Sequence, residues 1–232
     1  MWIGSLIALI ISKRIYSIRT DPNTSLPFTI YNASSEGEAL LKKNGIKYYS
    51  PEQNLGFHTD GIVSKNLLWS PNFVSIYNVY LGYKKPGNFH WVPFSLWDEF
   101  EKWKQELAAK RFKVEITPIT YKHANTELEV TSEGEFEVSL MRVDGDHCVP
   151  FFNGEVTACA SHPDFEIEKV KRMLISLSNN KTRISTPLRP RRLFILNNWL
   201  GAHARDIFED PLKNVKFTRS FFRMMSIEAA CA

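Results

Sequence analysis

The sequence predicts a mainly β fold, an antiparallel β-sandwich or jelly roll that carries inserted helices. Its 232 residues are 44% hydrophobic and 13% aromatic, which is a globular composition with a core suited to strands. Short apolar or alternating runs recur along the chain, separated by turn pairs such as Asn44-Gly45 and Asn153-Gly154. Two longer stretches instead repeat apolar residues at helical spacing. Many strands, few helices and no internal repeat indicate packed sheets in a single domain over residues 1–232.

The predicted strands are short, and turn residues separate most of them. The most distinct is the mostly apolar segment 73–81, which we expect to be buried on both faces. Residues 34–43 form a loop or a short helix. The other expected strands lie at 14–19, 27–33, 46–49, 89–92, 112–119, 127–131, 135–143, 148–152, 156–160, 192–196 and 215–225, with a polar loop at 206–214.

Two amphipathic helices interrupt the strands. The first has Ser95 as its expected N-cap, and its apolar stripe consists of Leu96, Phe100, Trp103 and Leu107. The second begins near Ser161, ends at Asn179-Asn180 and carries the stripe Ile167, Val170, Leu174 and Leu177. We interpret the aromatic side chains of the first stripe as core packing.

The ends and the cysteines of the chain bear on its location. The apolar run at residues 2–11 is about half the length that spans a bilayer, and Lys13 and Arg14 follow it, the reverse of the charge order in a signal peptide. We therefore expect a buried helix there and no membrane segment. Three cysteines without a CxxC pair favour a reducing cytoplasm over a disulfide framework.

The charge balance limits the class of partner. The formal net charge is +4, from 29 basic and 25 acidic residues. So small an excess is compatible with an anionic small molecule and does not argue for nucleic acid.

The segment 55–61 holds the most informative pair of side chains. His58 and Asp60 lie two residues apart, so on an extended strand they point to the same side and can reach one ion. His203, 145 residues downstream, is the best candidate for a third ligand. Two histidines and one carboxylate on one face of a metal are typical of non-haem Fe(II) oxygenases. A His-x-Asp pattern also recurs by chance, and His58 would then be a polar residue at a strand end.

The last predicted strand carries two arginines on one face. Arg219, Phe221 and Arg223 share parity, so both guanidinium groups point to the same side. Guanidinium groups facing into a barrel are costly unless an anion meets them. Arg219 could hold the far end of a dicarboxylate that chelates the metal, because a planar guanidinium binds a carboxylate through two hydrogen bonds. The alternative is an ordinary salt bridge to a neighbouring Asp or Glu.

These motifs resemble those of the Fe(II)/2-oxoglutarate-dependent dioxygenases, in the TauD/clavaminate-synthase-like branch. The proximal motif is matched by residues 56–61, the distal motif by 198–205, and the closing strand by 219–223 after Phe208. Three positions depart from the family pattern: Asn197 replaces Asp, Ala204 replaces Gly, and Phe89 replaces a Thr that helps to bind the cosubstrate carboxylate. The chain is also shorter than usual for this branch, and we expect the missing part to lie before residue 1.

The resemblance implies a double-stranded β-helix (jelly roll) and a small-molecule oxygenase. Fe(II) would be held by His58, Asp60 and His203, and the cosubstrate 2-oxoglutarate would place its distal carboxylate on Arg219. With O₂, such an enzyme would hydroxylate a small carboxylate-bearing molecule, such as an amino acid or a natural-product precursor of secondary metabolism. Arg223 and Arg205 are candidates for the substrate anion, although Arg205 could instead brace its loop.

Two other functions stay open at this point. The chain could be a catalytically degenerate jelly-roll binding or scaffold protein, which the Phe89 departure favours. It could also be a cupin-type metalloenzyme that does not use 2-oxoglutarate.

Overall fold

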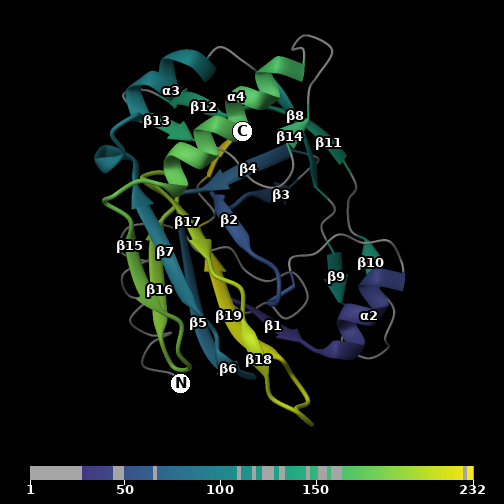
Figure 1. Ribbon diagram of the computed structural model, residues 1–232. Helices are drawn as coiled ribbons and strands as arrows, with labels where there is room; N and C mark the ends of the chain where they lie inside the picture. Colours follow the sequence, from purple (N-terminus) through teal and green to yellow (C-terminus); the bar gives the residue numbers. More distant parts are fainter. Residues whose placement is uncertain are drawn as a thin grey trace.

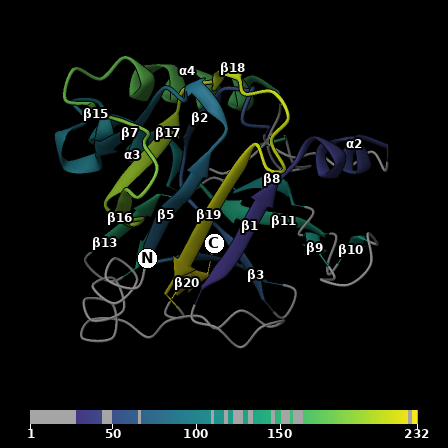
Figure 2. The ribbon, with the colours of Figure 1, turned by 90° about the horizontal axis from the view of Figure 1, so that it is seen from below.

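Two four-stranded antiparallel sheets form the centre of the protein (Figure 1). The computed structural model describes residues 28–43, 50–64, 67–108, 111–116, 119–121, 128–130, 134–144, 147–150, 156–157, 164–226 and 229–231. The first sheet has the order β1 (Thr29–Ala33), β19 (Arg219–Met225), β5 (Phe73–Leu81) and β16 (Leu193–Asn197), seen side by side in Figure 2. The second has the order β15 (Ile184–Pro187), β7 (Asn88–Pro93), β17 (Gly201–Arg205) and β2 (Leu55–His58).

The two sheets pack through an inner apolar cluster. Phe89 of β7 lies against Phe194 of β16, with their ring centroids 4.7 Å apart. The cluster also contains Leu81 of β5 and Leu196 of β16, which are 6% and 7% exposed. Because side chains alternate along a strand, this contact fixes which residues of β17 face the first sheet.

Helices cover the outer face of the second sheet. The helices α3 (Phe100–Leu107) and α4 (Asp164–Ser178) lie over the upper ends of β7 and β17 (Figure 1). Met173 and Leu177 of α4 are fully buried in one cluster with Val92 of β7 and Ala202 of β17. Burial of a side chain of this size contributes about 1.5–3 kcal/mol. The helices therefore pack against the outer face of β17, and the inner face of β17 is directed towards the first sheet.

The remaining elements are shorter and surround the two sheets. A three-stranded sheet has the order β11-β8-β14, another has β20-β4-β3, and three pairs complete the set. These elements are α2 (Ser35–Lys43), β3 (Ile62–Ser64), β4 (Leu67–Pro71), β6 (Tyr83–Lys85), η1 (Phe94–Leu96), β8 (Arg111–Ile116), β9 (Ile119–Tyr121), β10 (Leu128–Val130), β11 (Gly134–Ser139), β12 (Met141–Asp144), β13 (His147–Pro150), β14 (Val156–Thr157), β18 (Glu209–Pro211) and β20 (Ala229–Cys231).

Several predicted elements are confirmed. The strand at 73–81 is β5 with the same limits, and the segment 34–43 is helical. The side chain of Ser34 starts that helix, because its Oγ accepts a hydrogen bond from the backbone N–H of Gly37 at 3.1 Å. The helix that ends at Asn179-Asn180 is α4. The segments predicted at 2–11 and 14–19 lie outside the described residues.

Two predictions about element limits are wrong. Ser95 does not cap α3: residues 94–96 form a separate 3₁₀ turn, and α3 begins at Phe100 after Glu99. The last strand begins at Arg219 rather than at residue 215. His203 lies in the middle of the fully buried strand β17, which was not among the predicted strands. Among the described residues, no helix is long and apolar enough to cross a membrane.

Candidate metal centre

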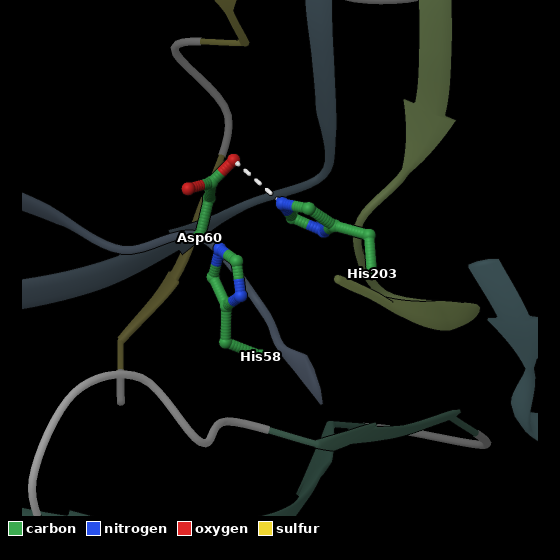
Figure 3. Close-up of side chains that lie close together, drawn as sticks. All are labelled: His58, Asp60 and His203. Atoms are coloured by element: carbon green, nitrogen blue, oxygen red, sulfur yellow. Dashed lines mark ion pairs between the residues drawn. The ribbon is translucent and has the colours of Figure 1, made fainter. Parts of the chain in front are cut away.

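The structure brings His58, Asp60 and His203 together at the inner face of the second sheet. Strand β17 pairs with β2 so that His203 lies directly opposite His58, and their ring centroids are 4.2 Å apart. Asp60 follows two residues after the end of β2. One possible ligand atom from each of the three side chains lies within 4.8 Å of the other two. Figure 3 shows the three side chains converging from these two segments.

A buried asparagine fixes the position of Asp60, which lies beyond the end of β2. The backbone N–H of Asp60 donates to Asn198 Oδ1 at 2.7 Å, and Asn198 Nδ2 donates to the carbonyl of Asp60 at 3.0 Å. The same amide also donates to Ser70 Oγ and to the carbonyl of Pro71. Asn198 is fully buried. In the sequence, the only indication that Asn198 is a functional residue is its position in the distal motif.

Both histidines are held in the neutral form that binds metals. Burial is the main reason that the pKa of His58 is lowered, and its Nδ1 lies 2.8 Å from the carbonyl of Gly56. That contact requires the proton on Nδ1, so Nε2 keeps its lone pair. Burial, followed by the neighbouring His58, lowers the pKa of His203 to about 3.

The two carboxylate oxygens of Asp60 meet different groups. Oδ2 lies 3.6 Å from Nε2 of His203, while Oδ1 forms an ion pair with Nη2 of Arg223. Burial alone would raise the pKa of Asp60, but the charge of Arg223 and the two imidazoles outweigh it and lower the pKa to about 2. Asp60 is therefore ionised at neutral pH.

Arg219 is the first residue of β19, four residues before Arg223, and it has no acidic partner among the described residues. Its Nη2 donates to Asn78 Oδ1 at 3.1 Å, its guanidinium carbon lies 4.1 Å from the ring centroid of Phe221, and its buried Nε has no hydrogen-bond partner in this part of the chain. Burial, followed by the charge of Arg205, lowers the pKa of Arg219 to about 9. The salt bridge that was the alternative for this residue is not found in the described residues.

Arg205 has a different environment. Its Nη atoms donate to the carbonyls of Ser50, Pro51 and Gln53 at 2.7, 2.9 and 3.0 Å. These hydrogen bonds connect the end of β17 to the loop that precedes β2. They are the contacts of a residue that braces this loop.

Phe89 occupies the wall of the centre. Its ring is stacked 5.7 Å from that of His203 and is only 8% exposed. It contributes an apolar surface where the resembling family has a threonine hydroxyl.

Solved structures with the same arrangement of elements are known. A taurine dioxygenase from Burkholderia xenovorans superposes with a TM-score of 0.61 at 13% sequence identity, over 97% of this chain and 73% of that chain. The chain has the fold of the taurine dioxygenases. A second protein from that organism, assigned as an alpha-ketoglutarate-dependent taurine dioxygenase, gives a TM-score of 0.59 at 10% identity over 97% and 78% of the two chains.

An asparagine oxygenase shares the taurine dioxygenase fold as well. It superposes with a TM-score of 0.58 at 11% identity over 97% of this chain, which spans 63% of that protein. Comparison by sequence with models of protein families and with curated proteins finds no match. The resemblance inferred from the sequence motifs is thus confirmed at the level of the fold.

Proposed function

We propose that the chain is a non-haem Fe(II)- and 2-oxoglutarate-dependent oxygenase, with His58, Asp60 and His203 as the metal ligands. The observation that carries this proposal is a buried group of two neutral imidazoles and one carboxylate. Arg223 contacts this carboxylate, and Arg219, on the same face of β19, has no acidic partner in the described residues. This donor set suits ferrous iron, whereas a thiolate-rich set would favour zinc or an iron–sulfur cluster. Iron with 2-oxoglutarate and O₂ would supply the oxidation of a substrate C–H bond.

Arg219 is the residue we propose for the distal carboxylate of 2-oxoglutarate. A buried guanidinium that has only an amide oxygen as its acceptor gains from an anion that takes its remaining donors. The resemblance in the motifs and the cosubstrate in the name of one structural neighbour support 2-oxoglutarate as that anion.

A small carboxylate-bearing molecule, such as an amino acid, is the substrate class we propose. The names of the neighbours give taurine and asparagine, both small molecules that carry an acidic group. Arg223 is the candidate for the substrate anion, since its side chain is still 21% exposed while it contacts Asp60. We assign Arg205 to the support of its loop.

The two facing sheets are, in this proposal, the halves of a double-stranded β-helix within one dioxygenase-like domain. Their four-and-four arrangement around the inner cluster supports this interpretation. A cytoplasmic location stays a prediction.

One observation favours the alternative of a catalytically degenerate jelly-roll binding or scaffold protein. Phe89 supplies no hydroxyl beside His203, so one contact to the cosubstrate carboxylate is lost relative to the resembling family. A cupin-type metalloenzyme, the other alternative, would bind the metal and not 2-oxoglutarate.

Anaerobic titration of the purified protein with Fe(II) and 2-oxoglutarate tests the proposal. We expect a visible metal-to-ligand charge-transfer band that is lost in both His58→Ala and Arg219→Met. Arg192→Met is the matched control, because Arg192 is only half-buried and, in the described residues, its Nη1 donates to the backbone carbonyl of Pro187 at 3.1 Å. Metal binding without a band would favour the cupin-type enzyme, and failure to bind iron would overturn the proposal.

A further inference from the structure

The ion pair between Arg223 and Asp60 places a fixed positive charge on the carboxylate that we propose as a metal ligand. Arg223 enters from β19 of the first sheet, whereas Asp60 follows β2 of the second sheet. The side chains of Asp60 and Arg223 are 11% and 21% exposed, so bulk water screens this contact only in part. The contact therefore crosses the interior between the two sheets.

Neighbouring groups hold Arg223 in this position. Arg223 donates a side-chain hydrogen bond to the hydroxyl oxygen of Tyr31, on the adjacent strand β1. The ring of Tyr31 is in turn stacked on Phe221, with centroids 4.9 Å apart. The guanidinium is thus positioned by its own sheet before any ligand arrives.

The interior around this pair contains further positive charge. Arg219 lies four residues earlier on the same face of β19 and has no acidic partner in the described part of the chain. The charges of Arg223 and Arg205 both contribute to lowering the pKa of His58. A divalent cation that binds between His58, Asp60 and His203 therefore meets a carboxylate whose charge Arg223 already balances.

We propose that Arg223 is an internal counter-ion that competes with the metal for Asp60 and so holds the metal affinity down until an anion engages the guanidinium. This inference rests on the proposed function and concerns the regulation of its metal centre. Oδ2 of Asp60 faces His203 and is available to a metal, while Oδ1 stays with Arg223, so the two cations share one carboxylate. The cost of this sharing arises from like-charge repulsion in a poorly screened site.

A consequence for the anionic substrate follows. An anion that binds Arg223 draws its charge away from Asp60 and strengthens metal binding. By thermodynamic linkage, the bound metal strengthens binding of that anion by the same factor. The arginine would therefore favour a centre that holds metal and anionic substrate together over one that holds the metal alone.

The affinity for Mn(II) alone, measured from the electron paramagnetic resonance signal of the free ion, tests the proposal without catalysis. We expect Arg223→Met to bind Mn(II) at least about tenfold more tightly than the wild type, which corresponds to about 1.4 kcal/mol. Arg223→Lys keeps the charge and should stay close to the wild type. Arg192→Met, which removes a half-buried positive charge bonded to the carbonyl of Pro187, should also leave the affinity unchanged.

A second variant covers the case in which Arg223→Met does not fold. Tyr31→Phe keeps the arginine but removes one contact that positions its guanidinium against Asp60, so the Mn(II) affinity should rise by a smaller factor. Equal or weaker binding by the folded Arg223→Met variant overturns the inference and leaves Arg223 as a ligand support or substrate residue. If neither the wild type nor the variants bind Mn(II), the proposed metal centre itself is overturned.

Discussion

Two histidine–aspartate groups lie on opposite faces of the same sheet, and their hydrogen bonding differs. On the outer face, His90 Nε2 lies 2.7 Å from Asp206 Oδ1, and His90 Nδ1 lies 2.8 Å from Ser185 Oγ. On the inner face, His203 Nε2 is 3.6 Å from Asp60, and its buried Nδ1 has no hydrogen-bond partner in the described part of the chain.

The outer group is complete, whereas the inner one is not. The second oxygen of Asp206 accepts hydrogen bonds from the backbone N–H and the side-chain amide of Asn88, at 2.9 and 3.0 Å. Every polar atom of the outer pair is therefore used to connect β15, β7 and the residue after β17. Buried polar atoms usually have partners, so the unused nitrogen and the long contact of the inner pair indicate a place for a ligand. The same residue types thus serve as a brace on one face and as a candidate metal centre on the other.

Alanine substitution of the two histidines should give the largest contrast. His203→Ala removes a proposed ligand, and we expect the Mn(II) affinity to fall by more than the roughly 10–100-fold loss that is typical when a residue hydrogen-bonded to a ligand is removed. His90→Ala should leave that affinity within about threefold of the wild type and instead lower the free energy of unfolding, by about 1–3 kcal/mol, because Asp206 loses a donor. Titration calorimetry and urea denaturation of both variants provide the measurements.

Equal changes in metal affinity for His203→Ala and His90→Ala would contradict the assignment of the metal centre to the inner face of the sheet.

Removal of the Asn198 side chain, which hydrogen-bonds to the N–H and the carbonyl of Asp60, should lower both the metal affinity and the stability. Asn198→Ala eliminates the hydrogen bonds that hold the peptide groups on both sides of Asp60 and leaves buried groups without partners. We expect a loss of about 2–4 kcal/mol in the free energy of unfolding and weaker Mn(II) binding. Asn197→Ala, one residue earlier, loses a single hydrogen bond to the backbone of Trp199 and provides the comparison. Equal metal affinity in the two variants would show that the position of Asp60 does not depend on its hydrogen bonds with Asn198.

The smallest effect should come from the carboxylate of the outer pair. Burial alone would raise the pKa of Asp206, but hydrogen bonds from His90 and Asn88 outweigh it and hold the pKa below its ordinary value. A lowered pKa in the folded state stabilises the protein above the unfolded-state pKa of about 3.9, and this contribution is lost as the pH falls through the folded-state pKa. Asp206→Asn should therefore cost about 1 kcal/mol near pH 6, a modest value because the side chain is 42% exposed.

Urea denaturation at several pH values measures this difference. The stabilities of the wild type and Asp206→Asn should converge below about pH 4. A difference that stays constant down to pH 3 would mean that the ionised carboxylate is not the stabilising form.

The sequence predicted the parts of the protein that depend on local periodicity and residue type. The limits of β5 followed from an apolar run, and the three candidate ligands followed from the i, i+2 spacing of His58 and Asp60 and from the distal motif around His203. Each of these patterns can be recognised from residues that are close together in the sequence. The strand around His203 escaped prediction because its small residues, Gly201, Ala202 and Ala204, have little strand propensity and become buried only under the helices.

Other features required the folded chain. Ser95 has a good capping sequence, but the chain forms a 3₁₀ turn there and begins α3 at Phe100. The contacts of Asn198 and Arg205 are with backbone carbonyls more than 100 residues away, and no side-chain pattern reports where a distant carbonyl points. The pairing of Arg223 with Asp60 depends likewise on how the two sheets face each other.

A metal ion bound between β2 and β17 would also stabilise the pairing of these two strands. Strand β2 is the edge of its sheet, and an irregularity in the ladder between His203 and Arg205 interrupts its pairing with β17. An ion bound by both His58 and His203 would connect this edge strand to β17, and it would stabilise the native state because the unfolded chain lacks the site. The metal would then slow fraying of β2, and the protease resistance of the segment 50–60 would report metal occupancy independently of any chemistry at the centre.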